Sequence, residues 1–196
     1  MTNDLSNRQI EIIEVSGRIL MEKGIKGLTT KNLALEMNFS ESALYRHFNN
    51  KEAIISLLIR YLSTNISNRF EEILNRNIAP DEKLLSLFQS QFSFFKKNPH
   101  FIIIVLSDGL MDESESIKQD IQTLMKSNSN HFKNVILAGQ EQECFNAEIE
   151  TEYLVHFVMG AFRLQMLKWK LANFDFDIEN HGLNTMKRLL LLMKAQ

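Results

Sequence analysis

The chain has 196 residues, of which 44% are hydrophobic and 23% are charged, and its formal net charge is -2. This length and composition suffice for a real core and exclude a polycation, although the net charge alone neither suggests nor excludes nucleic-acid binding. With only two prolines and seven glycines, the chain has fewer turn residues than a β-rich protein needs, which predicts an all-α fold.

The N-terminal segment MTNDLSNRQIEII lacks the basic start and the apolar run of a signal peptide. The longest purely apolar run, residues 101–106, is too short to span a bilayer. The single cysteine, Cys144, cannot form an internal disulfide, and no CxxC pair or Cys/His cluster indicates a metal site. We therefore predict a cytoplasmic protein without a membrane span, a metal or a cofactor.

The first predicted helix covers residues 7–23, where apolar side chains recur at helical spacing. Gly24 follows it, and glycine readily adopts the left-handed conformation that ends a helix. A long helix is predicted from residue 51 to about residue 76, beyond a break at Asn49 and Asn50. Asn50 is expected to cap it. A further helix is predicted to begin at Pro80. Four more helices are predicted at about residues 100–106, 114–137, 147–172 and 178–194.

Between the first helix and the long helix, two short helices are predicted at residues 30–37 and 41–48. Thr29 and Ser40 stand at their N-cap positions, where a hydroxyl accepts a bond from an otherwise unpaired backbone N–H. Asn38 lies in the turn and can adopt the left-handed conformation. Each helix also begins with a hydrophobic staple, Leu28 with Leu33 and Phe39 with Leu44.

Residues 29–48 meet the requirements of a helix-turn-helix, whose second helix enters the major groove of DNA. Leu44 and Phe48 are predicted to point inward, so that the small and polar residues of the same helix face outward. Phosphate contacts would come from the flanks. The residues predicted to contact DNA are Thr29, Thr30, Lys31, Ser40, Glu41, Ser42, Ala43, Tyr45, Arg46, His47 and Lys51.

The segment GLTTKNLALEMNFSESALYRHFNNKEAI resembles the DNA-binding region of the TetR family of transcriptional regulators. The residues that carry the resemblance are Thr29, Leu33-Ala34, Asn38-Phe39-Ser40, Leu44-Tyr45, Phe48 and Lys51. It covers about the first 55 residues densely, whereas the remainder agrees only in its helical layout. The domains implied are a helix-turn-helix domain at residues 1–50 and a helical effector-binding and dimerisation domain at residues 51–196.

Two residues depart from the family pattern. Asn38 replaces the usual turn glycine, which the left-handed conformation of asparagine tolerates. Glu41 stands where many members carry a basic or small residue. Its carboxylate is repelled by phosphate but can accept a bond from cytosine N4. It is equally explained as a surface acid favoured by the dipole at a helix N-terminus.

The resemblance implies a homodimer formed by the last two helices, in which two recognition helices about 34 Å apart read a palindromic operator. A monomer could also cover the apolar run near residue 190. Apolar residues of the last two predicted helices recur on one stripe of each. The residues predicted for the interface are Leu154, Phe157, Ala161, Leu164, Leu183, Met186 and Leu190.

The resemblance also implies an effector pocket, and the fourteen phenylalanines and nine methionines suit a mainly hydrophobic ligand. A solid core uses the same residue types, so both interpretations stay open. The residues predicted to line the pocket are Phe88, Phe92, Phe95, Ile104, Met111, Met125, Phe157 and Gln165.

The sequence has no nucleophile–base–acid set, GxGxxG motif or P-loop, so an enzyme is not predicted and no catalytic residue is assigned. The main hypothesis is a repressor that a small hydrophobic effector releases from its operator. One alternative is a regulator of the same fold gated by a protein partner. Another is a helical carrier of hydrophobic ligands, which would leave the capped helix pair at residues 29–48 unexplained.

Overall fold

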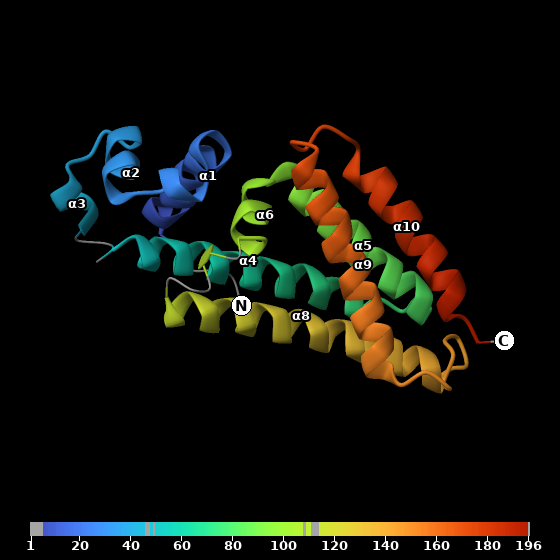
Figure 1. Ribbon diagram of the computed structural model, residues 1–196. Helices are drawn as coiled ribbons and strands as arrows, with labels where there is room; N and C mark the ends of the chain where they lie inside the picture. The colour runs from blue at the N-terminus through green and yellow to red at the C-terminus, as the bar shows by residue number, and fades with distance from the viewer. Residues whose placement is uncertain (1–5, 46–47, 49, 108, 111–113, 196) are drawn as a thin grey trace. The chain divides into compact units, whose positions relative to one another are not determined.

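The computed structural model describes residues 6–45, 48, 50–107, 109–110 and 114–195, and of Tyr45 only the backbone. These residues form helices and no strand, which confirms the predicted all-α class (Figure 1). An isolated bridge joins Phe145 to Lys194. The named helices are α1 (Asn7–Gly27), α2 (Thr30–Glu36), α3 (Glu41–Tyr45), α4 (Lys51–Leu74), α5 (Pro80–Lys97), α6 (His100–Val105), α8 (Glu115–Glu141), α9 (Thr151–Leu171) and α10 (Ile178–Met193).

Contacts divide the chain into two compact units, one of residues 1–64 and 98–124, the other of residues 65–97 and 125–196. We call them the N-terminal unit and the C-terminal unit. The helices α4 and α8 each contribute residues to both units. The domain boundary near residue 50, which the sequence places at the end of the helix-turn-helix, stays a prediction.

The first helix changes direction at Gly24, where the sequence predicts its end. Gly24 has φ 63° and ψ -170°, a conformation open essentially only to glycine, and one further turn follows to Gly27. The start of α1 carries a capping box that was not among the predicted features. The side chain of Ser6 accepts from the backbone of Gln9, whose side chain accepts in return from the backbone of Ser6.

The two short helices begin and turn as their caps predict. The hydroxyl of Thr29 accepts a bond from the backbone N–H of Asn32 at 3.1 Å. The hydroxyl of Ser40 does the same for Ala43 at 3.2 Å. Between them Asn38 has φ 54°, which confirms the left-handed turn. The apolar partners Leu28, Leu33 and Leu44 are fully buried.

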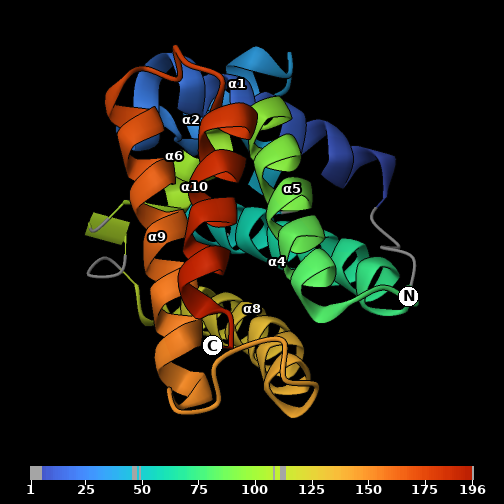
Figure 2. The same cartoon turned by 90° about the vertical axis from the view of Figure 1, so that its right-hand side faces the viewer.

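In the C-terminal unit, α10 packs against both α5 and α9, and the three helices lie side by side (Figure 2). The core beneath them is aromatic. Gly182 of α10 allows the close approach to α5, because a β-carbon there would stand 2.4 Å from the ring of Phe92. Neighbouring rings of this cluster have centroids 5.0–6.5 Å apart, and its members are Phe88, Phe92, Phe95, Phe132 and Phe162.

The connection between α8 and α9 differs from the prediction, since α8 continues to Glu141 and α9 begins only at Thr151. Glu143 then adopts φ 56°, and the next two backbone N–H groups both donate to the carbonyl of Gly139. The extension of α8 agrees with the good helix propensity of Gln and Glu. The local turn, rather than composition, sets where α8 ends.

Near the C-terminal end of α9, the side chain of the single tryptophan is buried and hydrogen bonded. Trp169 is 3% exposed, and its indole N–H donates to the carbonyl of Phe176 at 3.0 Å. The ring of Phe174 meets it edge-on with centroids 4.8 Å apart. This contact fixes the turn that leads from α9 to α10.

Candidate functional site

The start of α3 presents a polar, exposed surface. Ser40, Glu41 and Ser42 are exposed and Ala43 is half-buried, whereas Leu44 is fully buried. The hydroxyls of Ser40 and Ser42 are 3.0 Å apart and hydrogen bonded. This is the division of faces that a helix needs when its first turn meets the edges of base pairs. Of the predicted contacts, Arg46, His47 and the side chain of Tyr45 lie outside the described residues.

The predicted phosphate contacts stand at two other helix starts in the same unit. At the start of α2, Lys31 is exposed, and Thr29 and Thr30 are half-buried. At the start of α4, Lys51 is half-buried, and the side chain of Asn50 caps the helix by accepting from the backbone N–H of Ala53 at 2.9 Å. Exposed helix N-termini with nearby lysines suit a phosphate group, because both carry positive charge.

Two side-chain contacts that no sequence motif predicts hold this region together. The guanidinium of Arg8 in α1 lies over the ring of Phe39 in the turn, 3.8 Å from its centroid. The side-chain amide of Asn32 donates to the carbonyl of Gly27 at 2.8 Å. Neither partner is indicated by a local pattern. Together they tie the turn and the start of α2 to α1.

The predicted effector residues are distributed over both units. Phe88, Phe92 and Phe95 are buried in the aromatic cluster, and Ile104 is buried in the N-terminal unit. Met125 and Phe157 are about half exposed at the surface. Gln165 is half-buried and donates to the hydroxyl of Thr185, and Met111 lies outside the described residues.

The predicted dimer residues also divide into two groups. Leu154, Met186 and Leu190 are buried in the C-terminal unit itself, so in this structure they are unavailable to a second copy. Phe157 and Leu164 are 48% and 49% exposed. Ala161 and Leu183 are half-buried. The exposed apolar residues of α9 and α10, which we call the α9–α10 stripe, are Tyr153, Phe157, Leu164, Leu167, Leu171, Leu191 and Leu192.

A half-buried cation links α4 to α5, and no motif indicated it. The guanidinium of Arg69 donates to the carbonyl of Ser90 and to the side-chain oxygen of Gln91, each at 2.8 Å. It also lies 4.6 Å from the ring centroid of Phe94. Burial lowers the pKa of Arg69 to about 10. These acceptors are neutral, so Arg69 serves as a hydrogen-bonding clamp between two helices.

Among the residues that the structure describes, no three His, Cys, Asp or Glu side chains stand close enough to hold a metal ion. Within the same residues, no helix is both long and apolar enough to cross a membrane.

A capped helix pair whose second helix begins with an exposed polar turn, followed by a helical unit with an exposed apolar stripe, is the architecture of a DNA-binding transcriptional regulator. Residues 12–58 match the family model of "Bacterial regulatory proteins, tetR family". Residues 61–193 match the model "YsiA-like protein, C-terminal region". The chain belongs to the TetR family of bacterial regulatory proteins. Duplex DNA and a second copy of the chain are therefore its classes of partner.

Curated and solved relatives agree with this assignment. The nucleoid occlusion factor SlmA of Photobacterium profundum is 25% identical over 89% of each chain. The structure of the fatty acid degradation regulator FadR from Bacillus halodurans has a TM-score of 0.85 and 17% identity, over 96% of this chain and 97% of that one. FadR from Bacillus subtilis, solved in complex with stearoyl-CoA, has a TM-score of 0.79 and 17% identity, over 92% and 97%. At these identities the solved structures show a shared fold.

Proposed function

We propose that the chain is a repressor that a fatty-acyl thioester releases from a palindromic operator. The supporting observation is the match of nearly the whole chain to two FadR proteins, one a fatty acid degradation regulator and the other solved with stearoyl-CoA. The apolar interior of the C-terminal unit suits the same ligand class, because an acyl chain gains free energy by leaving water. We further propose that the protein has no catalytic role and works in the cytoplasm beside its DNA.

In this proposal the acyl chain enters the aromatic cluster. Phe88 and Phe92 are fully buried, whereas Phe162 is half-buried and its ring packs at a tilt against both. Phe162 is therefore the ring that can swing aside at the least cost. An acyl chain would separate these rings, so the ligand selects a conformation with an opened cluster. Because α4 contributes to both units, a shift in α4 would link effector binding to DNA binding.

The proposed DNA contacts are the residues predicted from the sequence. Ser40, Glu41, Ser42 and Ala43 would face the base pairs, together with Tyr45, Arg46 and His47 in the same helix prediction. Thr29, Thr30, Lys31 and Lys51 would hold phosphates and position α3. The exposed start of α3 above a buried Leu44 supports this assignment.

The test starts with selection of bound fragments from a genomic library, followed by fluorescence anisotropy on the selected site. Binding should fall steeply with salt, because phosphate contacts release counterions. Lys31→Ala should weaken binding to all sequences, whereas Lys126→Ala in α8 should not. Failure to retain any fragment at low salt would contradict the DNA-binding assignment.

The effector part of the proposal is tested on the same complex. Stearoyl-CoA should release the DNA at micromolar concentration, and free coenzyme A should not. Phe162→Trp should weaken the response without changing DNA affinity in the absence of ligand, since a larger ring obstructs the opening. If stearoyl-CoA neither binds nor releases DNA, the effector assignment is wrong while the regulator assignment stands.

A partner-gated regulator is the second candidate. It is supported by the filled aromatic cluster and by the similarity to SlmA, which is named as a nucleoid occlusion factor. It predicts that acyl thioesters leave the DNA complex unchanged and that a protein partner alters it. The stearoyl-CoA titration therefore separates the two candidates.

A further inference from the structure

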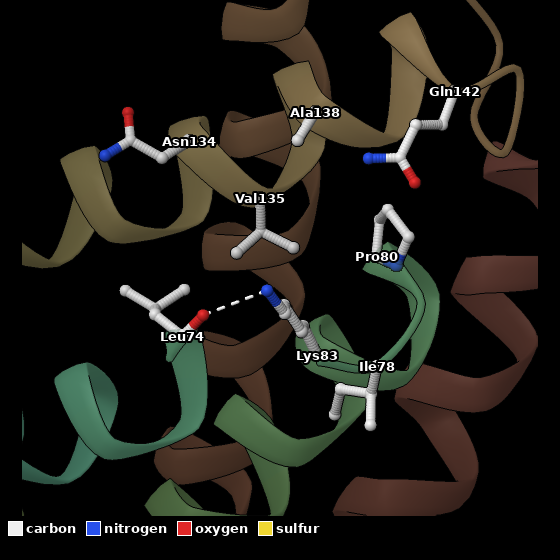
Figure 3. A pocket seen from close by; sticks show the side chains of 8 residues that line it. All are labelled: Leu74, Ile78, Pro80, Lys83, Asn134, Val135, Ala138 and Gln142. Carbon is white, nitrogen blue, oxygen red and sulfur yellow. Dashed lines mark hydrogen bonds between the residues drawn. The ribbon is translucent and has the colours of Figure 1, made fainter. Parts of the chain in front are cut away.

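A groove separate from the aromatic cluster opens where the end of α4 and the start of α5 meet α8, all within the C-terminal unit (Figure 3). Its volume is about 250 Å³. Apolar side chains cover most of its wall, together with Lys83 and two side-chain amides, one on α8 and one in the turn that follows it. The lining residues are Leu74, Ile78, Pro80, Lys83, Asn134, Val135, Ala138 and Gln142.

Lys83 gives the groove a positive charge. Its ammonium donates to the carbonyl of Leu74, the last residue of α4, at 2.9 Å. Among the described residues no carboxylate lies within ion-pair distance of Lys83, although the ammonium has three N–H donors. A half-buried cation bonded to one carbonyl is incompletely compensated, which favours an anion beside it.

The neighbouring charges favour a single negative charge on the occupant. Asp81, two residues before Lys83 at the start of α5, pairs with Lys194 at 3.7 Å rather than with Lys83. A dianionic phosphate would meet one ammonium and this nearby carboxylate, whereas tight phosphate sites use several cationic or backbone donors. The side-chain amides of Asn134 and Gln142 are exposed and can donate to a carboxylate oxygen.

We propose that this groove binds a small amphipathic monocarboxylate. Its carboxylate accepts bonds from Lys83, and its apolar chain lies against Val135, Ala138 and Ile78. The volume of about 250 Å³ is below the usual range for drug-sized ligands. At ~30 Å³ for a water-sized group it holds about eight such groups, which accommodates most of the non-hydrogen atoms of octanoate. None of the predicted effector residues lines this groove, so the proposal does not rest on the acyl thioester.

The test is calorimetric titration of the full chain with octanoate and with octan-1-ol, which has the same chain and no charge. Octanoate should bind at one site per protomer and at least tenfold more tightly than the alcohol. Lys83→Met keeps the aliphatic stem and removes the charge, so it should abolish this preference. Lys97→Met, on the same helix but outside the groove, should leave both affinities unchanged.

A second variant keeps the result decisive if Lys83→Met folds poorly. Ala138→Leu fills the groove and retains the lysine, so it should weaken the binding of octanoate and octanol alike by at least tenfold. The methyl resonance of Ala138 in the wild-type protein should shift on addition of octanoate. Equal affinity for acid and alcohol, or octanoate affinity unaffected by Ala138→Leu, would overturn the proposal.

Discussion

The imidazole of His100 lies directly against the backbone of Gly17. A β-carbon added at Gly17 would stand 3.1 Å from the Cγ, Nδ1 and Cε1 atoms of that ring. Both residues are in the N-terminal unit, where α6 packs on α1. The missing side chain at residue 17 therefore sets how closely these two helices approach.

Enlarging residue 17 should loosen this contact. An alanine in place of a helical glycine usually adds up to ~1 kcal/mol of stability, but the His100 ring should offset most of that gain in Gly17→Ala. Gly17→Leu should lower the free energy of unfolding by about 1–3 kcal/mol, as overpacking does. Urea denaturation followed by circular dichroism measures both. A Gly17→Leu protein as stable as the wild type would show that α6 shifts freely.

The same histidine should make stability depend on pH. Burial lowers the pKa of His100 to about 4, and its Nε2 has no hydrogen-bond partner among the described residues. The unfolded chain therefore takes up a proton near pH 6.5, whereas the folded protein does so only near pH 4. Stability should fall as the pH drops between these values, by roughly 3 kcal/mol for this group. His100→Gln should flatten that part of the profile, and an unchanged slope would contradict the burial of a neutral imidazole.

Asn38 offers a test of the turn between α2 and α3. Its φ of 54° places a non-glycine residue in the left-handed region. Asn38→Gly should raise the free energy of unfolding by roughly 0.5–1 kcal/mol, and Asn38→Val should lower it by about 1–2 kcal/mol. Thermal melts of the two variants provide the comparison. The opposite order would mean that the turn has another conformation.

The contact between α10 and α5 depends on a second glycine. A β-carbon at Gly182 would stand 2.4 Å from the ring of Phe92, which is fully buried and in contact with Phe88 and Phe162. Since that ring has no free space, Gly182→Ala should destabilise the protein by ~1–3 kcal/mol. The matched control is Gly160→Ala in α9, where nothing lies within 4 Å of the added carbon within the protomer. In chemical denaturation, Gly160→Ala should raise the free energy of unfolding or leave it nearly unchanged.

Introducing a charged residue into the α9–α10 stripe should weaken the dimer. Phe157 and Leu164 are seven residues apart, hence on one face of α9, and each is about half exposed. In a twofold interface each substitution occurs twice, so Phe157→Glu or Leu164→Glu should raise the dimer dissociation constant at least tenfold. Analytical ultracentrifugation measures this. Leu137→Glu, at an exposed site on α8, should leave the dimer intact, and intact dimers of all three would place the interface elsewhere.

Features decided by a few neighbouring residues could be predicted from the sequence. Thr29, Ser40 and Asn50 cap their helices as expected, because a cap needs only a side-chain oxygen and a backbone N–H about three residues later. Asn38 follows the same local logic. The starts of the two short helices and the turn between them could therefore be predicted from local patterns alone.

Features decided by packing between distant segments could not be predicted. Helical spacing identified apolar stripes on α9 and α10, but Met186 and Leu190 turned out to face the interior, whereas Leu191 and Leu192 are exposed. Helical periodicity predicts that an apolar stripe exists. Which of its residues are buried depends on the tertiary packing. The link that Arg69 makes to α5 gave no sequence signal, since its partners on that helix lie 21 and 22 residues away.

Trp169 can serve as an intrinsic fluorescence probe. With one tryptophan in 196 residues, excitation near the red edge of protein absorption reports a single place, the junction of α9 and α10. The buried indole, bonded to the carbonyl of Phe176, should emit at short wavelength and shift to the red when that junction opens. Events beside the proposed second-copy surface can thus be followed in the unlabelled protein, without a dye or an added chromophore.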